Sequence, residues 1–111
     1  MTTVYNIIFT ATADECLLNI AEYIAQDNRE RAETFIEEII ESLYKILSIF
    51  PFSGKIYEEI ENIGEIRSQP HKNYVSFYRI VDDTVEILYI FHSAKNIQDI
   101  FGSMSEHREY L

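Results

Sequence analysis

The chain has 111 residues, 47% of them apolar, which is enough for one hydrophobic core and predicts a single domain over residues 1–111. Its 19 acidic residues outnumber 9 Lys and Arg, and the formal net charge of −10 argues against direct, non-specific binding to DNA or RNA. No apolar run approaches the roughly 18 residues of a membrane span, and no basic stretch marks a signal peptide. The one cysteine, Cys16, fits a reducing cytoplasm and is interpreted as a helix residue.

The charge is distributed unevenly. Residues 1–66 hold 13 of the 19 acids and 4 of the 9 Lys and Arg. Residues 66–81 contain no acid at all, but they do contain three basic residues and a histidine: Arg67, Lys72, Arg79 and His71. A small, locally basic surface on an acidic body is therefore expected.

The first half of the chain predicts a strand followed by two helices. Residues 4–9 are β-branched and aromatic, as in a strand, and Thr12 with Glu15 has the spacing of a reciprocal helix cap. Apolar residues then recur at helical spacing over about 12 residues, and Asn28 can cap a second, longer helix that ends at Pro51. The short connection predicts an antiparallel helical hairpin. Four glutamates are assigned to a solvated outer face of the second helix: Glu33, Glu37, Glu38 and Glu41.

The second half predicts strands. Residues 55–65 fit a loop or an irregular strand, and residues 64–69, 74–81 and 84–91 fit regular strands. A two-residue turn at Asp82-Asp83 would place Arg79 opposite Glu86. The predicted fold class is α+β: an N-terminal strand, a helical hairpin packed on a small antiparallel sheet, and a short C-terminal helix or tail over residues 97–111.

Both faces of the last hairpin are largely apolar, so both are expected to be covered, one by the helices and the other by the C-terminal segment or a partner. One face is predicted to carry Tyr74, Tyr78, Ile80, Val85, Ile87, Tyr89 and Phe91. The other is predicted to carry Val75, Phe77, Val81, Leu88 and Ile90.

Several sequence segments, taken in order, resemble the RelE/ParE toxin superfamily, and most closely its ParE-like branch. They are NIAEYIAQDN, RAETFIEEIIESLYKIL, FPFSG, the Ile66-Arg67 pair, YVSFYRI and ILYIFHSAKNI, and the resemblance covers about residues 14–100. It implies the toxin of a type II toxin–antitoxin system that is neutralised by a cognate antitoxin. ParE-like members inhibit DNA gyrase, whereas RelE-like members cleave messenger RNA on the ribosome.

The residues that the resemblance associates with RNA cleavage are incomplete here. Arg67 matches a basic strand position, and Lys95 can stand in for another arginine. Val75 occupies the place of a second arginine, and Phe101 the place of a catalytic tyrosine, although phenylalanine cannot exchange a proton. We therefore favour a ParE-like inhibitor without catalytic residues, and keep a ribosome-dependent ribonuclease and a disarmed, antitoxin-binding homologue as alternatives. The pair Lys95-Asn96 departs from the Arg-Asp common in ParE-like proteins.

The candidate target contacts are Arg67, Arg79, His92 and Lys95, and the candidate antitoxin contacts are Tyr74, Tyr78 and Phe101. Arg79 has the alternative role of a cross-strand partner for Glu86, and His92 that of a histidine satisfied by a nearby group. The histidines are too scattered for a metal site, and no cofactor is expected. The acidic body predicts that the antitoxin tail carries Lys or Arg.

Overall fold

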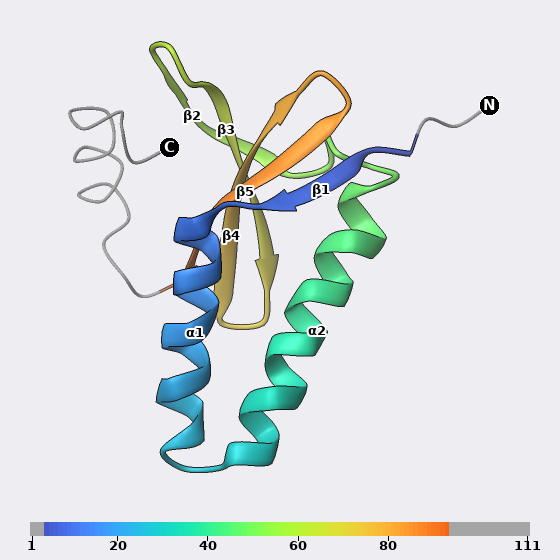
Figure 1. The fold of residues 1–111 in the computed structure, drawn as a ribbon. Helices are drawn as coiled ribbons and strands as arrows, with labels where there is room; N and C mark the ends of the chain where they lie inside the picture. The colour runs from blue at the N-terminus through green and yellow to red at the C-terminus, as the bar shows by residue number, and fades with distance from the viewer. Residues whose placement is uncertain (1–3, 94–111) are drawn as a thin grey trace.

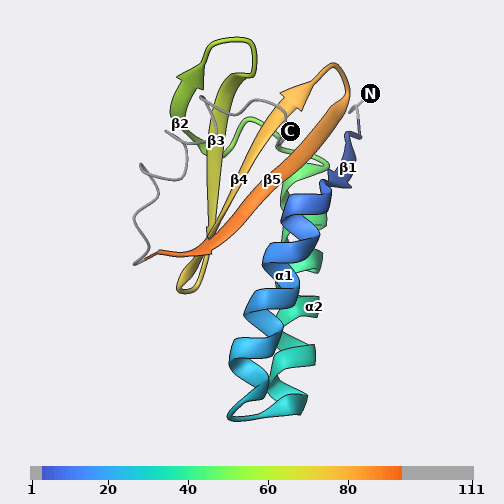
Figure 2. The same ribbon diagram turned by 60° about the vertical axis from the view of Figure 1, so that its left-hand side comes forward.

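Two helices lie against one face of a five-stranded sheet in the computed structural model, which describes residues 4–93 (Figures 1 and 2). The elements are β1 (Asn6–Phe9), α1 (Ala11–Ala25), α2 (Arg29–Leu47), β2 (Lys55–Ile60), β3 (Gly64–His71), β4 (Tyr74–Val81) and β5 (Thr84–His92). The predicted α+β class is confirmed, and the uncertain stretch after Gly54 contains a strand, β2, with an irregular register near its start. The C-terminal helix predicted for residues 97–111 lies outside the described residues.

The sheet is mixed, whereas a purely antiparallel sheet was expected. Its strand order is β1-β5-β4-β3-β2, and every neighbouring pair is antiparallel except β1 and β5, which run parallel. The parallel pair arises because the whole helical hairpin and three strands separate β1 from β5 in the chain. Figure 1 shows β1 at the edge of the sheet, beside β5 and above the two helices.

Capping side chains set where the helices begin. The first helix starts at Ala11, and its cap is Thr10, whose hydroxyl accepts a hydrogen bond from the Ala13 amide at 3.1 Å. The predicted cap at Thr12 is wrong, because the Thr10 hydroxyl also donates to the Ile87 carbonyl at 2.9 Å and so fixes the start of the helix on β5. Asn28 caps α2 as predicted, with its Oδ1 accepting from the Arg31 amide at 3.0 Å. Neither helix in residues 4–93 has the length and apolar character needed to cross a membrane.

The β4–β5 hairpin contains a register shift that changes which side chains face the helices. Phe77 pairs with Tyr89 and Tyr78 with Ile87, so Leu88 is an extra residue in β5. Ile90 therefore packs with the helices, while Tyr89 and Phe91 pack in the opposite cluster, which corrects the face assignment made from strict alternation. The predicted turn is confirmed, with Val81 opposite Thr84, Arg79 opposite Glu86 and a φ of 56° at Asp82.

Each face of the sheet carries an apolar cluster. The helix side buries Ala13, Leu17, Ile20, Phe35, Ile39, Leu43, Leu47, Tyr78, Val85, Ile87 and Ile90. The other side buries Ile60, Ile66, Phe77 and Leu88, with Ile63, Val75, Tyr89 and Phe91 packed around them. The expectation that both faces are apolar thus holds within the described residues.

A buried tyrosine holds the loop between α2 and β2 against the sheet. The hydroxyl of Tyr78 donates to the Pro51 carbonyl at 2.7 Å and accepts from the Gly54 amide at 3.1 Å. The approach is so close that a Cβ on Gly54 would lie 2.4 Å from that hydroxyl and 2.6 Å from the Ser68 carbonyl. Position 54 therefore requires glycine for space, because a Cβ would have to push the loop away from β4.

We predict that Tyr78→Phe destabilises the fold by about 1–3 kcal/mol, because it leaves a buried carbonyl and a buried amide without their partner. Urea unfolding measures this change. Tyr23→Phe is the matched control, because the Tyr23 side chain is exposed, and it should change the free energy of unfolding by less than about 0.5 kcal/mol. Equal effects of the two substitutions would contradict the role given to the Tyr78 hydroxyl.

Candidate functional site

Arg67 is hydrogen-bonded to the same loop that Tyr78 holds. Its guanidinium donates to the Gly54 carbonyl at 2.9 Å and to the Phe52 carbonyl at 3.2 Å, and it lies over the Phe52 ring at 5.1 Å. Its other terminal nitrogen is 3.8 Å from the Glu65 carboxylate, and only 14% of the side chain is exposed. Arg67 thus has a structural role, which the sequence could not separate from a role in target contact.

Arg79 is paired across the sheet. Its Nε lies 2.6 Å from Oε1 of Glu86, and another of its nitrogens donates to the Ile63 carbonyl at 3.3 Å. The alternative reading of Arg79 as a cross-strand partner is therefore correct. Both side chains of this pair are about one quarter exposed, so the charges are only partly removed from water.

The two arginines meet at a small recess where β3 and β4 diverge. Arg67 and Tyr78 are the last paired residues of the β3–β4 ladder. The recess beyond this pair has a volume of about 290 Å³. Its walls are Phe52, Ile63, Gly64, Glu65, Arg67, Arg79, Ile80 and Asp82. Two acids thus balance two bases, so this recess offers no surplus positive charge to a phosphate.

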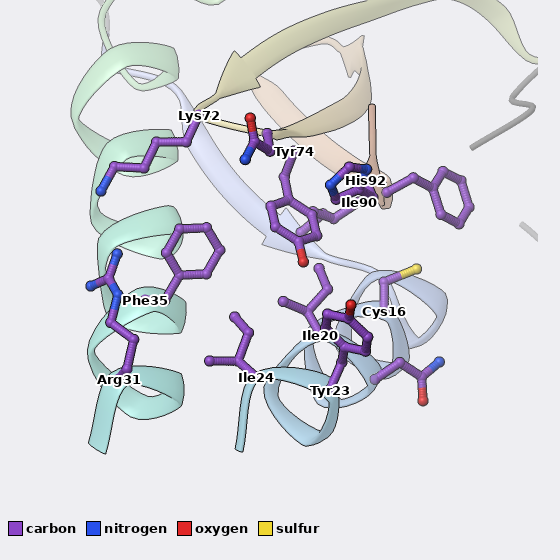
Figure 3. Close-up of a pocket in the computed structure, with 13 residues that line it drawn as sticks. Cys16, Ile20, Tyr23, Ile24, Arg31, Phe35, Lys72, Tyr74, Ile90 and His92 are labelled. Atoms are coloured by element: carbon purple, nitrogen blue, oxygen red, sulfur yellow. The ribbon is translucent and has the colours of Figure 1, made fainter. Parts of the chain in front are cut away.

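A larger groove opens between the helical hairpin and the opposite end of the sheet (Figure 3). Its volume is about 700 Å³. The described residues that line it are Cys16, Asn19, Ile20, Tyr23, Ile24, Arg31, Phe35, Lys72, Asn73, Tyr74, Ile90, Phe91 and His92. In Figure 3, Ile20, Tyr23 and Ile24 rise from α1, Phe35 and Arg31 project from α2, and Tyr74 and His92 come from the sheet.

The two described candidates for antitoxin contact lie in different places: Tyr74 lines the groove, and Tyr78 is buried in the core. Tyr74 is half-buried in the groove, with its ring 5.3 Å from Phe35 and 5.2 Å from His92. Burial raises the pKa of Tyr74, with a smaller contribution from Tyr23, so its hydroxyl stays protonated at neutral pH. Tyr78 is fully buried beneath the helices and is not available to a partner, which corrects its assignment as an antitoxin contact. Burial also raises the pKa of Tyr78.

Lys95 and Phe101 lie outside the described residues, so their positions relative to the groove are not assigned. Among residues 4–93, no group of three or more His, Cys, Asp or Glu side chains is arranged to hold a metal ion.

A cluster around Glu38 joins α2 to the β3–β4 turn. Oε1 of Glu38 accepts from Arg31 at 3.0 Å, and its Oε2 lies 3.4 Å from Lys72 Nζ and 4.0 Å from His71 Nε2. The ring of Phe35 lies beneath, with the Arg31 and Lys72 charges 5.2 and 5.9 Å from its centroid. The assignment of Glu38 to a purely solvated face is therefore wrong.

Two sequence signals pointed to this cluster. Arg31 precedes Glu38 by two helical turns, which places both on one face of the helix, and Lys72 belongs to the acid-free stretch. The side-chain hydrogen bond from Arg31 lowers the pKa of Glu38 below its ordinary value of 4.5, and the charges of Arg31 and Lys72 lower it further.

Comparison with known proteins identifies similar sequences and structures. Residues 7–97 match the family described as the ParE toxin of the type II toxin–antitoxin system parDE. The fold is similar to that of the chromosomal ParDE toxin–antitoxin system from P. aeruginosa, with a TM-score of 0.66 and 16% identity over 82% of this chain and 98% of that one.

A second similar structure is the toxin–antitoxin complex RelBE2 from Mycobacterium tuberculosis. The TM-score is 0.63, with 26% identity over 86% of this chain and 98% of that one. No curated protein sequence matches the chain.

The lowered pKa of Glu38 predicts a pH-dependent contribution to stability. The charged form of Glu38 is favoured in the folded state, so its contribution is present above the unfolded pKa of about 4.5 and is lost as the pH falls through the lower, folded value. Glu38→Gln should therefore be less stable than the parent at pH 7, and the gap should close towards pH 3. Urea unfolding at both pH values measures it.

The control for this prediction is Glu33→Gln, on the exposed face of the same helix. It should leave the pH dependence unchanged. A gap between parent and Glu38→Gln that is the same at pH 7 and pH 3 would show that the charge of Glu38 is not what stabilises the fold.

Proposed function

Because the chain belongs to the ParE family of toxins from type II toxin–antitoxin systems, we propose that it inhibits growth by binding DNA gyrase. A cognate antitoxin neutralises it by covering its surface. The match covers residues 7–97 and includes every helix and strand except the first residue of β1. Since gyrase acts on DNA in the cytoplasm, the toxin would act there too.

The observation that supports this proposal is that the side chains of both sheet arginines are hydrogen-bonded to partners within the chain. Cleavage of RNA requires basic groups that stabilise the charge developing on the phosphate, and a group that exchanges a proton. Arg67 donates to two loop carbonyls, Arg79 is paired with Glu86, and position 75 is valine. Neither arginine can leave its partners for a phosphate without loosening the fold.

Two further properties favour a protein target over RNA. Burial raises the pKa of Tyr74, which lines the larger groove, away from the range useful to a base at neutral pH. The net charge of −10 opposes approach to the ribosome, whose surface is rich in phosphate. Inhibition by binding needs neither a proton-transfer group nor a positive field over the whole molecule.

Messenger RNA cleavage of the RelE type is the second candidate, and the 26% identity with the RelBE2 structure favours it. Lys95 would then supply a basic group in place of an arginine, as the sequence resemblance implies. A homologue that binds its antitoxin but has lost toxicity is the third possibility.

The remaining candidate contacts divide between target and antitoxin. Within the described residues, Tyr74 has the properties of an antitoxin contact, because it is an aromatic side chain lining an open, mostly apolar groove. His92, at the end of β5, and Lys95, three residues further on, are proposed to contact gyrase. Arg67 and Arg79 are proposed to support that surface from within the fold, without direct contact.

We predict that induced expression of the chain alone slows bacterial growth, and that co-expression of the small protein encoded beside it restores growth. The purified chain should inhibit DNA supercoiling by gyrase in vitro. The double variant His92→Ala/Lys95→Ala should weaken that inhibition roughly tenfold, as expected for the loss of contacts at a protein interface. Lys55→Ala, at an exposed position on β2, is the matched control and should inhibit like the parent. Abundant folded protein with no effect on growth or on gyrase would contradict the proposal.

The chain should leave translated messenger RNA intact. Primer extension on messages from induced cells, and on messages in a cell-free translation reaction containing the purified chain, should reveal no new 5′ ends. Cuts at defined codon positions that appear only when ribosomes are translating would reject the gyrase proposal in favour of the RelE-type activity.

A further inference from the structure

The groove of about 700 Å³ has a charged end and an apolar body. In Figure 3, Arg31 from α2 and Lys72 from the β3–β4 turn lie at one end, with Phe35 between them, while Ile20, Ile24 and Tyr74 surround the adjoining space. The rings of Phe35 and Tyr74 are 5.3 Å apart and form a continuous aromatic wall. An occupant must therefore offer apolar side chains along most of its length and a polar group at this one end.

The charge of the groove is opposite to that of the whole chain. None of the described residues that line it is acidic, although the chain has 19 acids and a net charge of −10. Its two cations, Arg31 and Lys72, share the single carboxylate of Glu38, at 3.0 and 3.4 Å. Two positive charges against one negative charge leave a surplus positive charge at the mouth of the groove.

Both cations are already held in place. Arg31 is fixed by Glu38 and by the ring of Phe35, and Lys72 is held over the same ring from the turn, where its φ is 54°. Holding them in advance lowers the side-chain entropy lost when a carboxylate binds between them. The Lys72 side chain remains 56% exposed, and that of Arg31 41%, so an anion can reach both.

We propose that this groove binds an apolar segment of the antitoxin that presents an Asp or Glu carboxylate to Arg31 and Lys72. The inference rests on the proposed function for the identity of the partner, and on the charge of the groove for its chemistry. It refines the expectation from net charge: a basic partner is attracted by the acidic body over a distance, whereas the docking segment itself is apolar and locally acidic. The surplus positive charge thereby selects which part of a basic partner enters the groove.

The test is to pan a phage-displayed library of random dodecapeptides on the immobilised full chain. Enriched peptides are synthesised with a fluorescent label, and their dissociation constants are measured by polarisation. The peptides should combine large apolar residues with at least one Asp or Glu. The variant Arg31→Gln/Lys72→Gln should bind them about tenfold more weakly, a change typical of losing two charge-assisted contacts.

A matched control removes the same charge elsewhere. Arg29→Gln/Lys45→Gln changes two exposed cations of α2 that do not line the groove, and it should bind the peptides like the parent. A charge exchange separates recognition from damage to the fold: peptides with Lys in place of the acid should bind the variant Arg31→Glu/Lys72→Glu better than they bind the parent. Instability alone could not produce such a gain.

The binding experiments would overturn the inference if they gave no enrichment over an unrelated acidic domain, enriched peptides without acidic residues, or equal binding to the groove and control variants. The panning experiment involves neither gyrase nor a growth assay. The proposal of gyrase inhibition and the proposal about the groove can therefore be rejected independently. Acidic–apolar peptides selected by a chain that is harmless to cells would reject the proposed toxin activity alone. Toxicity that is neutralised by an antitoxin equally well in Arg31→Gln/Lys72→Gln would reject the groove assignment alone.

Discussion

The hydroxyl of Tyr78 is the point on which the arrangement of helices and sheet depends. It bridges the Pro51 carbonyl and the Gly54 amide, and so fixes the few residues in which the chain leaves α2 and enters β2. Arg67 adds two hydrogen bonds to the same loop from the neighbouring strand. Because Tyr78 and Arg67 are directly paired in the β3–β4 ladder, one position in the sheet anchors the end of the long helix. The middle of α2 is attached through Glu38 and Phe35 to the β3–β4 hairpin, and the large groove lies beside that second attachment.

The internal bonds of both sheet arginines support the proposal that this chain acts by binding a protein, in a fold that it shares with the RelBE2 complex. A basic side chain that donates to carbonyl or carboxylate groups inside the chain is unavailable to a phosphate, and both sheet arginines are in that state. Arg31 and Lys72, two cations that share the single carboxylate of Glu38, lie instead beside an apolar groove. Aromatic walls and an isolated charge are features of protein recognition. The same scaffold therefore offers binding surfaces while its arginines stabilise the fold.

The features predicted correctly from sequence were those determined by local chemistry. Asn28 caps α2 because of its side chain, and the two-residue turn at Asp82 placed Arg79 opposite Glu86 by simple counting. The errors arose where distant parts of the chain decide the outcome. The extra residue Leu88 reversed the faces of residues 89–91 in β5, and the contact between Thr10 and the Ile87 carbonyl moved the start of α1. Neither is visible in the spacing of apolar residues, since a register shift and a long-range hydrogen bond leave no local pattern.

For the candidate site, the structure gives Arg67, Arg79 and Tyr78 roles inside the fold that sequence reasoning could not separate from roles in binding. Tyr78 is an aromatic residue on a strand, which fits a binding surface and a core equally well until the helices are placed over it. The most direct test of its role is amide hydrogen exchange at Gly54, followed by NMR. If Tyr78 anchors the loop, the Gly54 amide should exchange about as slowly as the amides of β4, although it lies outside any helix or strand, and Tyr78→Phe should accelerate it selectively. Exchange as rapid as that of an exposed loop amide in the parent chain would contradict the account.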